Sequence, residues 1–405
     1  MPFGLSRSRP PVIGVDFGAD RVKLVQVQPG DPHQLIGAAA AEMPLNSREA
    51  PADRLAFLAE ALPQLLRKQP FKGRRAILSM PALHTIVQQL VVEIAPEASV
   101  DDQVADELQS RLGIDPHRTL VRHHEVPVPG RGNQREFVCL AAPRDAVMRY
   151  IDLARRCKLD IVGMYAEPQA ILTAFDFMHR RAGDDQRAVA YIDIGAASTK
   201  VVVSHGTTMV FAKAVPIGGD QFVREHARKQ ECGFAEARQN RIAQANGQAA
   251  PAPAAAAVAE PEIKPARRSR LAALSPDPDL DDMPPLRHGS DAEMPERITR
   301  KQAPAGSGSE ALDCLIDEIT LCVRHHTNSF PDVPLERLVF LGGEAGCTPT
   351  CQAIAKAVRT AAQLGDPLGR VTRKPRQKPT PGLDLREPQP GWAVPLGLSL
   401  SEPNL

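Results

Sequence analysis

The sequence predicts an α/β fold in which one strand–turn–strand unit is used twice. The first copy is V-I-G-V-D-F-G-A-D-R-V-K at Val12–Lys23, and the second is V-A-Y-I-D-I-G-A-A-S-T-K at Val189–Lys200. Both contain D-x-G-A-x-x-x-K, and an apolar run follows each turn as well as preceding it. A glycine turn lets backbone N–H groups approach phosphate oxygens, and an aspartate at a strand end can hold a hydrated Mg²⁺. Two such turns that face each other would clamp a polyphosphate.

The composition is typical of a globular protein of two or more domains. Its 405 residues carry 49 Lys and Arg against 48 Asp and Glu, a balance that gives no reason to expect nucleic acid. No apolar run approaches the ~18–20 residues of a membrane-spanning helix, and the start lacks a signal-peptide core, so we expect a cytoplasmic protein. Seven scattered cysteines argue against a disulfide framework. We expect the histidine pairs His123–His124 and His325–His326 to be solvated.

Alternating and helical patterns predict the elements of the first half. After the hairpin Val12–Val27, we expect a strand at Gln34–Ala41 and an amphipathic helix at Asp53–Arg67, which Pro63 could kink or break. Ser99 is a candidate N-cap for the next helix. Further strands are expected at Arg75–Met80, Thr85–Val92, Leu120–Val126, Glu136–Ala142 and Ile161–Tyr165, and further helices at Val100–Leu112, Asp145–Cys157 and Glu167–His179.

The second half opens with a predicted three-stranded meander and contains a long stretch of different composition. Residues Asn246–Glu310 are rich in Ala and Pro and lack aromatic residues, which predicts a disordered insertion. The expected strands are Arg187–Asp193, Thr199–Ser204, Met209–Val215 and Leu338–Leu341. Helices are expected to begin at Asp220 and at Ala311, and a third helix is expected at about Thr350–Gln363. Residues Arg370–Lys378 are expected to form a solvated basic loop.

The order of three motifs resembles the actin-like ATPase superfamily of actin, the 70-kDa heat-shock proteins and the sugar kinases. Asp16–Lys23 resembles its first phosphate motif, Asp193–Thr199 its second, and Leu338–Glu344 its adenosine motif. Glu167–Ala170 resembles the connecting helix that carries a water-orienting Glu or Gln in active relatives. The resemblance implies duplicated ribonuclease-H-like domains with a nucleotide in the cleft between them.

Within this superfamily the chain resembles the PilM family of type IV pilus assembly, and more distantly the division protein FtsA. The matching segments are Gly14–Gly18 with Lys23–Val25, Ala141–Arg144, Pro216–Gly219 and Ala393–Leu398. The resemblance implies an ATP-binding adaptor, peripheral at the cytoplasmic face of the inner membrane. Such an adaptor binds the cytoplasmic N-terminal tail of a PilN-like inner-membrane protein and connects it to pilus motor or platform proteins. Self-association is left open.

The same resemblance divides the chain into four parts. The first actin-like subdomain would comprise residues 10–73 and 163–186, and the second would comprise residues 187–217 and 330–405. An inserted α+β subdomain that binds the partner would comprise residues 74–162. A helical subdomain would comprise residues 218–329 and be interrupted by the disordered insertion 246–310.

The predicted cofactors are ATP and Mg²⁺. Asp16 and Asp193 would hold Mg²⁺ through waters, and Lys23 would reach the phosphates. Glu167 would orient an attacking water as the catalytic residue. The ordinary alternatives are turn-stabilising aspartates, an exposed strand lysine and a glutamate favoured by a helix N-terminus. The remaining predicted nucleotide contacts are Gly18, Ala19, Asp20, Gly195, Ala196, Ala197, Thr199, Gly218, Gly219, Gly342, Gly343 and Glu344.

Several functions are compatible with these residues. We favour the adaptor, with at most a slow ATPase activity. The alternatives are an FtsA-like division or membrane adaptor, an ATPase or small-molecule kinase of the same fold, and a scaffold without nucleotide. A kinase would need a catalytic aspartate beside an acceptor pocket, and the segment between the two phosphate motifs offers no recognisable one. The sequence does not separate a pilus machine from a related secretion machine.

Overall fold

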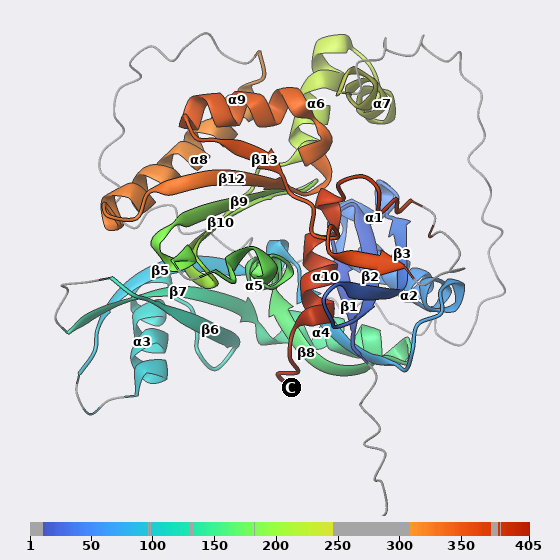
Figure 1. Ribbon diagram of the computed structural model, residues 1–405. Helices are drawn as coiled ribbons and strands as arrows, with labels where there is room; N and C mark the ends of the chain where they lie inside the picture. Colours follow the sequence, from blue (N-terminus) through green and yellow to red (C-terminus); the bar gives the residue numbers. More distant parts are fainter. Residues whose placement is uncertain are drawn as a thin grey trace, which may run out of the picture.

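Two large mixed sheets and one small antiparallel sheet form the framework of the molecule (Figure 1). The computed structural model describes residues 11–95, 97, 99–128, 133–181, 183–245, 308–373, 380 and 382–405. Apart from its last three residues, the predicted insertion 246–310 therefore lies outside the described residues, as do residues 374–378 of the predicted basic loop.

The six-stranded sheet contains the first glycine turn and has the strand order β14-β3-β2-β1-β4-β8. Strands β1 and β2 form an antiparallel hairpin, and β4 lies parallel to β1 on its other side. Every residue of β1 is buried, as expected for a central strand that is covered on both faces. The strands are β1 (Ile13–Phe17), β2 (Arg21–Gln28), β3 (His33–Glu42), β4 (Arg75–Met80), β8 (Asp160–Ala166) and β14 (Val371–Arg373).

Helices α2 and α4 pack against this sheet. Leu58 and Leu62 of α2 share a buried apolar cluster with Ile13 of β1, because the apolar stripe of the helix faces the sheet. Helix α2 continues through Pro63, so the break considered at that residue does not occur. The helices of this half are α1 (Asn46–Glu49), α2 (Pro51–Lys68) and α4 (Arg144–Arg156).

The five-stranded sheet repeats the same arrangement around the second glycine turn. Its order is β11-β10-β9-β12-β13, with an antiparallel β9–β10 hairpin and β12 parallel to β9. The predicted duplication of one unit is therefore confirmed. The elements are β9 (Ala188–Ile194), β10 (Thr199–His205), β11 (Thr208–Val215), β12 (Leu335–Leu341) and β13 (Ala362–Leu364), with α6 (Gly219–Gln230), α7 (Phe234–Ala245), α8 (Glu310–Ser329), the short turn η5 (Gly343–Gly346) and α9 (Thr348–Val358).

An inserted α+β subdomain lies between β4 and β8 in the chain. Its three strands have the order β5-β7-β6, and helix α3 packs on them. Ser99 caps α3 by accepting from the backbone N–H of Asp102, and Gly113 ends it in a left-handed conformation with φ 65°. The elements are η1 (Ala82–His84), β5 (Ile86–Glu93), α3 (Val100–Leu112), β6 (Thr119–Val126) and β7 (Gln134–Pro143).

The chain passes between the two large sheets twice. After β8 it runs through residues 167–187 to β9, and after β13 it returns through residues 365–370 to β14. The first passage contains α5 (Glu167–Ala174), η2 (Asp176–His179) and η3 (Asp184–Gln186). The helix expected to reach His179 thus ends at Ala174, because Phe175 leaves the helical conformation. The second passage connects two strands that sequence patterns did not reveal.

Helix α10 (Ala393–Leu400) fills the space between β1 and α5, where no helix was predicted. A Cβ at Gly397 would lie 1.8 Å from the carbonyl oxygen of Ala170, and one at Gly14 would lie 2.1 Å from that of Pro395. Glycine at both positions therefore permits the close approach. Both α10 and β14 fall within residues 330–405, predicted for the second subdomain, yet they pack on and join the six-stranded sheet.

Two further features differ from expectation. The helix expected to reach Gln363 ends at Val358, because Arg359 adopts a left-handed conformation with φ 56°. His326 is buried, not solvated, and its Nε2 lies 2.8 Å from Nε2 of His205. No helix in the described part of the chain is both long and apolar enough to cross a lipid bilayer.

Candidate functional site

The two glycine turns place an aspartate and a lysine at matching positions. Asp16 on β1 is the strand partner of Lys23 on β2, and Asp193 on β9 is the partner of Lys200 on β10. In the first turn, Lys23 Nζ lies 3.6 Å from Asp16 Oδ2. Ser79 on β4 supports this turn by accepting from the backbone N–H of Phe17 at 2.9 Å.

Five charged side chains from five elements form one cluster, here called the charged cluster: Asp16, Lys23, Glu167, Asp193 and Lys200. Burial raises the pKa of Asp16 to about 6. Within the cluster, the carboxylates of Glu167 and Asp193 raise that pKa further, whereas the two ammonium groups oppose the shift. The first four members were predicted from sequence to serve one site, and the structure brings them together with Lys200.

Lys200 pairs with a carboxylate of the second turn and with one of α5. Its Nζ lies 2.9 Å from Glu167 Oε2 and 3.0 Å from Asp193 Oδ2. Burial alone would lower the pKa of Lys200, but Asp193 and Glu167 outweigh it and raise that pKa. The other oxygen of Glu167 accepts the backbone N–H of Ala82 at 3.2 Å. The predicted water-orienting carboxylate is therefore held by two donors.

This arrangement does not fit a Mg²⁺ ion held between the two turns. Asp193 and Glu167 direct oxygens to the Lys200 ammonium, and Asp16 faces Lys23. In the described ranges, no three His, Cys, Asp or Glu side chains form a group that could hold a metal ion. A cation near Asp193 would meet a fixed positive charge instead of an open carboxylate pair.

Arg54 of α2 holds the first turn by hydrogen bonds to its backbone. This buried guanidinium donates to three successive carbonyl oxygens, those of Phe17 at 2.6 Å, Gly18 at 2.9 Å and Ala19 at 3.3 Å. These three bonds attach the backbone of the first turn to α2. A Cβ at Gly18 would lie 2.7 Å from the carbonyl oxygen of Arg21, so the hairpin also requires a glycine there.

The second turn is closed by the start of α6. The carbonyl oxygens of Gly195 and Ala196 accept from the backbone N–H groups of Gly219 and Asp220 at 2.9 and 2.8 Å. Thr199 is fully buried, and its hydroxyl donates to the carbonyl oxygen of Ile217 at 2.7 Å. Thr199 therefore holds the turn together instead of facing the cleft. Ala197 lies at the exposed tip, and Gly218 leaves no room for a Cβ against the turn.

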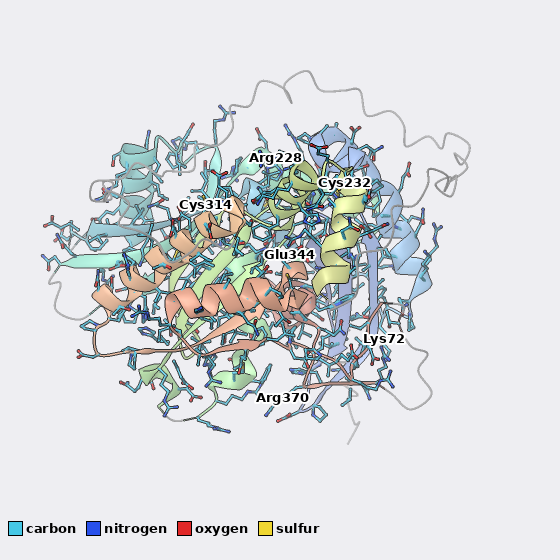
Figure 2. All side chains as sticks on the ribbon, turned by 90° about the horizontal axis from the view of Figure 1, so that it is seen from above. Lys72, Arg228, Cys232, Cys314, Glu344 and Arg370 are labelled. Carbon is cyan, nitrogen blue, oxygen red and sulfur yellow. The ribbon has the colours of Figure 1, made fainter. Side chains whose placement is uncertain are left out.

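The predicted adenosine motif lies beside this turn. Gly342 adopts φ 86°, and a Cβ there would lie 2.3 Å from the carbonyl oxygen of Ile194. Gly343 and Glu344 follow in η5, where Glu344 covers Gly219 and binds Arg241 of α7 at 2.8 Å. In Figure 2, Glu344 lies between α9 and the helices near Arg228 and Cys232. The predicted contacts of the second half thus surround one small region.

Ion pairs join the two halves at the edge of this region; we call Asp20, Glu42, Arg48, Asp220 and Arg238 the cleft bridge. Arg238 on α7 lies 3.3 Å from Asp20 and also binds Glu42. Arg48 on α1 lies 3.5 Å from Asp220 at the start of α6. Asp20, predicted to contact the nucleotide, instead faces a guanidinium of the opposite half.

Sequence reasoning missed the roles of Lys200, Arg54, Ser79, Arg238 and Arg241. Lys200 had a visible signal, since it ends the second copy of the repeated motif. The other four act through partners that are distant in the chain, and no local pattern marks them.

A separate cavity of about 620 Å³, here called the groove, lies where the inserted subdomain meets both halves. Its walls come from β6, from α5 with η2, and from the β10–β11 hairpin. The lining side chains include Glu125, Leu172, Phe177, Thr208 and Met209. The groove contains none of the charged cluster, so the molecule offers two distinct candidate sites.

The chain matches the family model described as "Type IV pilus assembly protein PilM" over residues 14–252, more than half of its length. A chain of the solved "PilM-PilN type IV pilus biogenesis complex" is 19% identical with a TM-score of 0.69, and the match covers 97% of this chain and 98% of that one. The ethanolamine utilization protein EutJ from Carboxydothermus hydrogenoformans is 12% identical with a TM-score of 0.48, over 97% and 90% of the two chains. The chain therefore belongs to the PilM family of type IV pilus assembly proteins and has the actin-like fold of that family.

Proposed function

We propose that this protein is a nucleotide-binding adaptor of a type IV pilus machine. ATP occupies the cleft between the two glycine turns, and the cytoplasmic N-terminal tail of a PilN-like inner-membrane protein occupies the groove. That partner keeps the protein at the inner membrane, next to motor or platform proteins. The observation that carries the proposal is the convergence of both turns, from two duplicated halves, on one charged cluster.

The nucleotide proposal is supported by groups on both sides of the cleft. Lys23 is held loosely by Asp16, and its side chain is 17% exposed, so its ammonium group can turn toward a phosphate. Gly18 and Gly195 bring backbone close to the same place. The close packing at Gly219 and Gly342 holds Glu344 and Arg241 beside the second turn, where the nucleoside is proposed to lie.

Thermal melting of the purified chain with and without ATP tests this proposal. A ligand at about 100 times its Kd stabilises a folded protein by about 2.7 kcal/mol, which raises the melting temperature by several degrees. Lys23→Met should lose most of that rise. Lys213→Met is the matched control, because it removes a strand lysine paired with Glu318, away from the cluster. An unchanged melting temperature of the unaltered chain with ATP would remove the nucleotide from the proposal.

The partner proposal is supported by the walls of the groove. Apolar side chains from α5 and β11 and polar groups from β6 line one continuous cavity, a combination that suits an extended peptide with alternating apolar anchors. The solved relative with the same fold was determined as a complex of PilM with PilN. The inserted subdomain, predicted to bind the partner, contributes His124 and Glu125 to the wall.

A fluorescent peptide with the sequence of the PilN-like tail from the same genome tests the groove. The unaltered chain should bind it, and Leu172→Glu should weaken binding at least about tenfold because it buries a charge against the peptide. Leu321→Glu on α8 is the matched control, since Leu321 is an exposed leucine of the second half. No binding to the unaltered, folded chain would eliminate the adaptor function.

The adaptor is better supported than an ATPase or a kinase. The carboxylate expected to orient an attacking water, Glu167, already accepts from the backbone N–H of Ala82 and forms an ion pair with Lys200. A general base must reach the proton that it removes, and both oxygens of this carboxylate are engaged. We therefore propose that hydrolysis is slow at most, and that the bound nucleotide acts through the conformation it holds.

A further inference from the structure

The Lys200 ammonium is a nearly buried positive charge beside the second glycine turn. It contacts carboxylates from two different elements, α5 and β9, and the side chains of Lys200, Glu167 and Asp193 are 9%, 7% and 8% exposed. The Cα of Gly195 lies beside it, because a Cβ there would be 3.4 Å from Nζ. This lysine therefore lies directly under the turn predicted to bind phosphate.

The two halves use the same motif position differently. Lys23 ends the first D-x-G-A-x-x-x-K motif and has one carboxylate partner at 3.6 Å. Lys200 ends the second motif and has two partners at 2.9 and 3.0 Å. The longer single contact leaves Lys23 free to move toward a ligand, whereas the two short contacts fix Lys200 in place.

A fixed ammonium group at this point has two electrostatic effects. It neutralises carboxylates that would otherwise repel a phosphate chain, which is the effect expected of a bound divalent cation. It also repels any second cation that approaches Glu167 and Asp193. The first effect favours a nucleotide in the cleft, and the second disfavours a metal ion that would accompany it.

We propose that the ammonium group of Lys200 takes the place of a divalent cation in this cleft, so that the protein binds ATP without Mg²⁺. This inference rests on the nucleotide binding proposed above and adds a requirement to it. Glu167 and Asp193 then serve as anchors for Lys200. The phosphates meet the ammonium groups of Lys23 and Lys200 from the two sides.

Isothermal titration calorimetry of the full chain with ATP, once with Mg²⁺ and once with EDTA, is the direct test. The Kd in EDTA should be no more than about threefold weaker than the Kd with Mg²⁺, a difference of less than 1.4 kcal/mol. A Kd about tenfold or more weaker in EDTA would overturn the inference while leaving the nucleotide proposal intact. The absence of binding in both buffers would refute the nucleotide proposal and this inference with it.

Lys200→Thr identifies the group responsible. Threonine is small, neutral and suited to a strand, and it exposes both carboxylates to a metal ion. This variant should require Mg²⁺, with binding at least about tenfold weaker in EDTA. The control Lys213→Thr, on the neighbouring strand β11, should behave like the unaltered chain. Metal-independent binding by Lys200→Thr would contradict the role given to this lysine.

Removal of Lys200 leaves two buried carboxylates without a cation, which can prevent folding. The double variant Lys200→Thr/Glu167→Gln lowers that unpaired charge and keeps Asp193 available to the metal. Circular dichroism establishes that each variant is folded before titration. The double variant should show the same dependence on Mg²⁺, and metal-independent binding by the folded double variant would also overturn the inference.

Discussion

Arg238 on α7 lies 3.3 Å from Asp20 at the first glycine turn, and this ion pair spans the two halves of the molecule. The same guanidinium binds Glu42 at the end of β3, and Arg48 forms a second link to Asp220. These five residues of the cleft bridge lie at the edge of the proposed nucleotide cleft. Each of these ion pairs joins a residue from the half with the six-stranded sheet to one from the half with the five-stranded sheet. Opening of the cleft must therefore break these ion pairs.

Arg238→Ala should therefore speed the release of nucleotide. Partly exposed ion pairs contribute about 1 kcal/mol or less, so we expect the dissociation rate to rise up to about fivefold. Stopped-flow measurement with a fluorescent ATP analogue gives this rate directly. Arg228→Ala, at an exposed position of α6, serves as the control. Equal rates for both variants and the unaltered chain would show that the cleft bridge does not restrain opening.

Arg54→Met should destabilise the fold and weaken nucleotide binding together. The variant leaves the carbonyls of the first turn without their buried donor, which we expect to cost about 3 kcal/mol. Urea denaturation measures the stability, and titration with ATP measures the affinity. Arg67→Met removes an exposed arginine from the same helix and should change neither quantity. A stable Arg54→Met variant with normal ATP affinity would refute the role of Arg54 in holding the first glycine turn.

Asp16→Asn should make the nucleotide-free protein more stable at pH 7. Burial raises the pKa of Asp16 from 3.8 to about 6, so stability falls as pH rises between these values and the ionised group costs about 3 kcal/mol above pH 6. Asparagine removes this cost. Urea denaturation at pH 4.5 and pH 7, with Asp332→Asn on an exposed turn as control, checks it. A variant that is less stable at pH 7 would contradict the assigned pKa.

Glu225→Gln should weaken the attachment of α8. Burial alone would raise the pKa of Glu225, but hydrogen bonds from Lys229, Ser309 and the backbone of Ala311 and Glu310 lower it to about 2. The resulting stability is present above the unfolded pKa of 4.5 and is lost as pH falls toward 2, an effect of about 1–2 kcal/mol after solvent screening.

Urea denaturation of the unaltered chain at pH 6 and pH 3 should reveal this loss, and the Glu225→Gln variant should lack it. Glu236→Gln, at an exposed position of α7, is the control and should retain the full pH dependence. The same pH dependence in both variants would mean that another carboxylate is responsible.

Local patterns predicted the two hairpins because strand alternation and a glycine turn are properties of adjacent residues. They could not predict α10, because its residues are buried on every side and show no amphipathic period. Strands β13 and β14 contain three residues each and exist only through pairing with distant strands. Lys200 belongs to a motif that the sequence displays, yet its contact with Glu167 depends on the packing of α5 against β10.

Only the segments 167–187 and 365–370 connect the two large sheets within the described chain. The inserted sheet adds a noncovalent contact, because Gln89 of β5 donates to the carbonyl oxygen of Val210 on β11 at 3.3 Å. The groove takes walls from both partners of that contact, with Glu125 on β6 and Thr208 on β11. Any movement of the five-stranded sheet relative to the inserted sheet would therefore change the width of the groove.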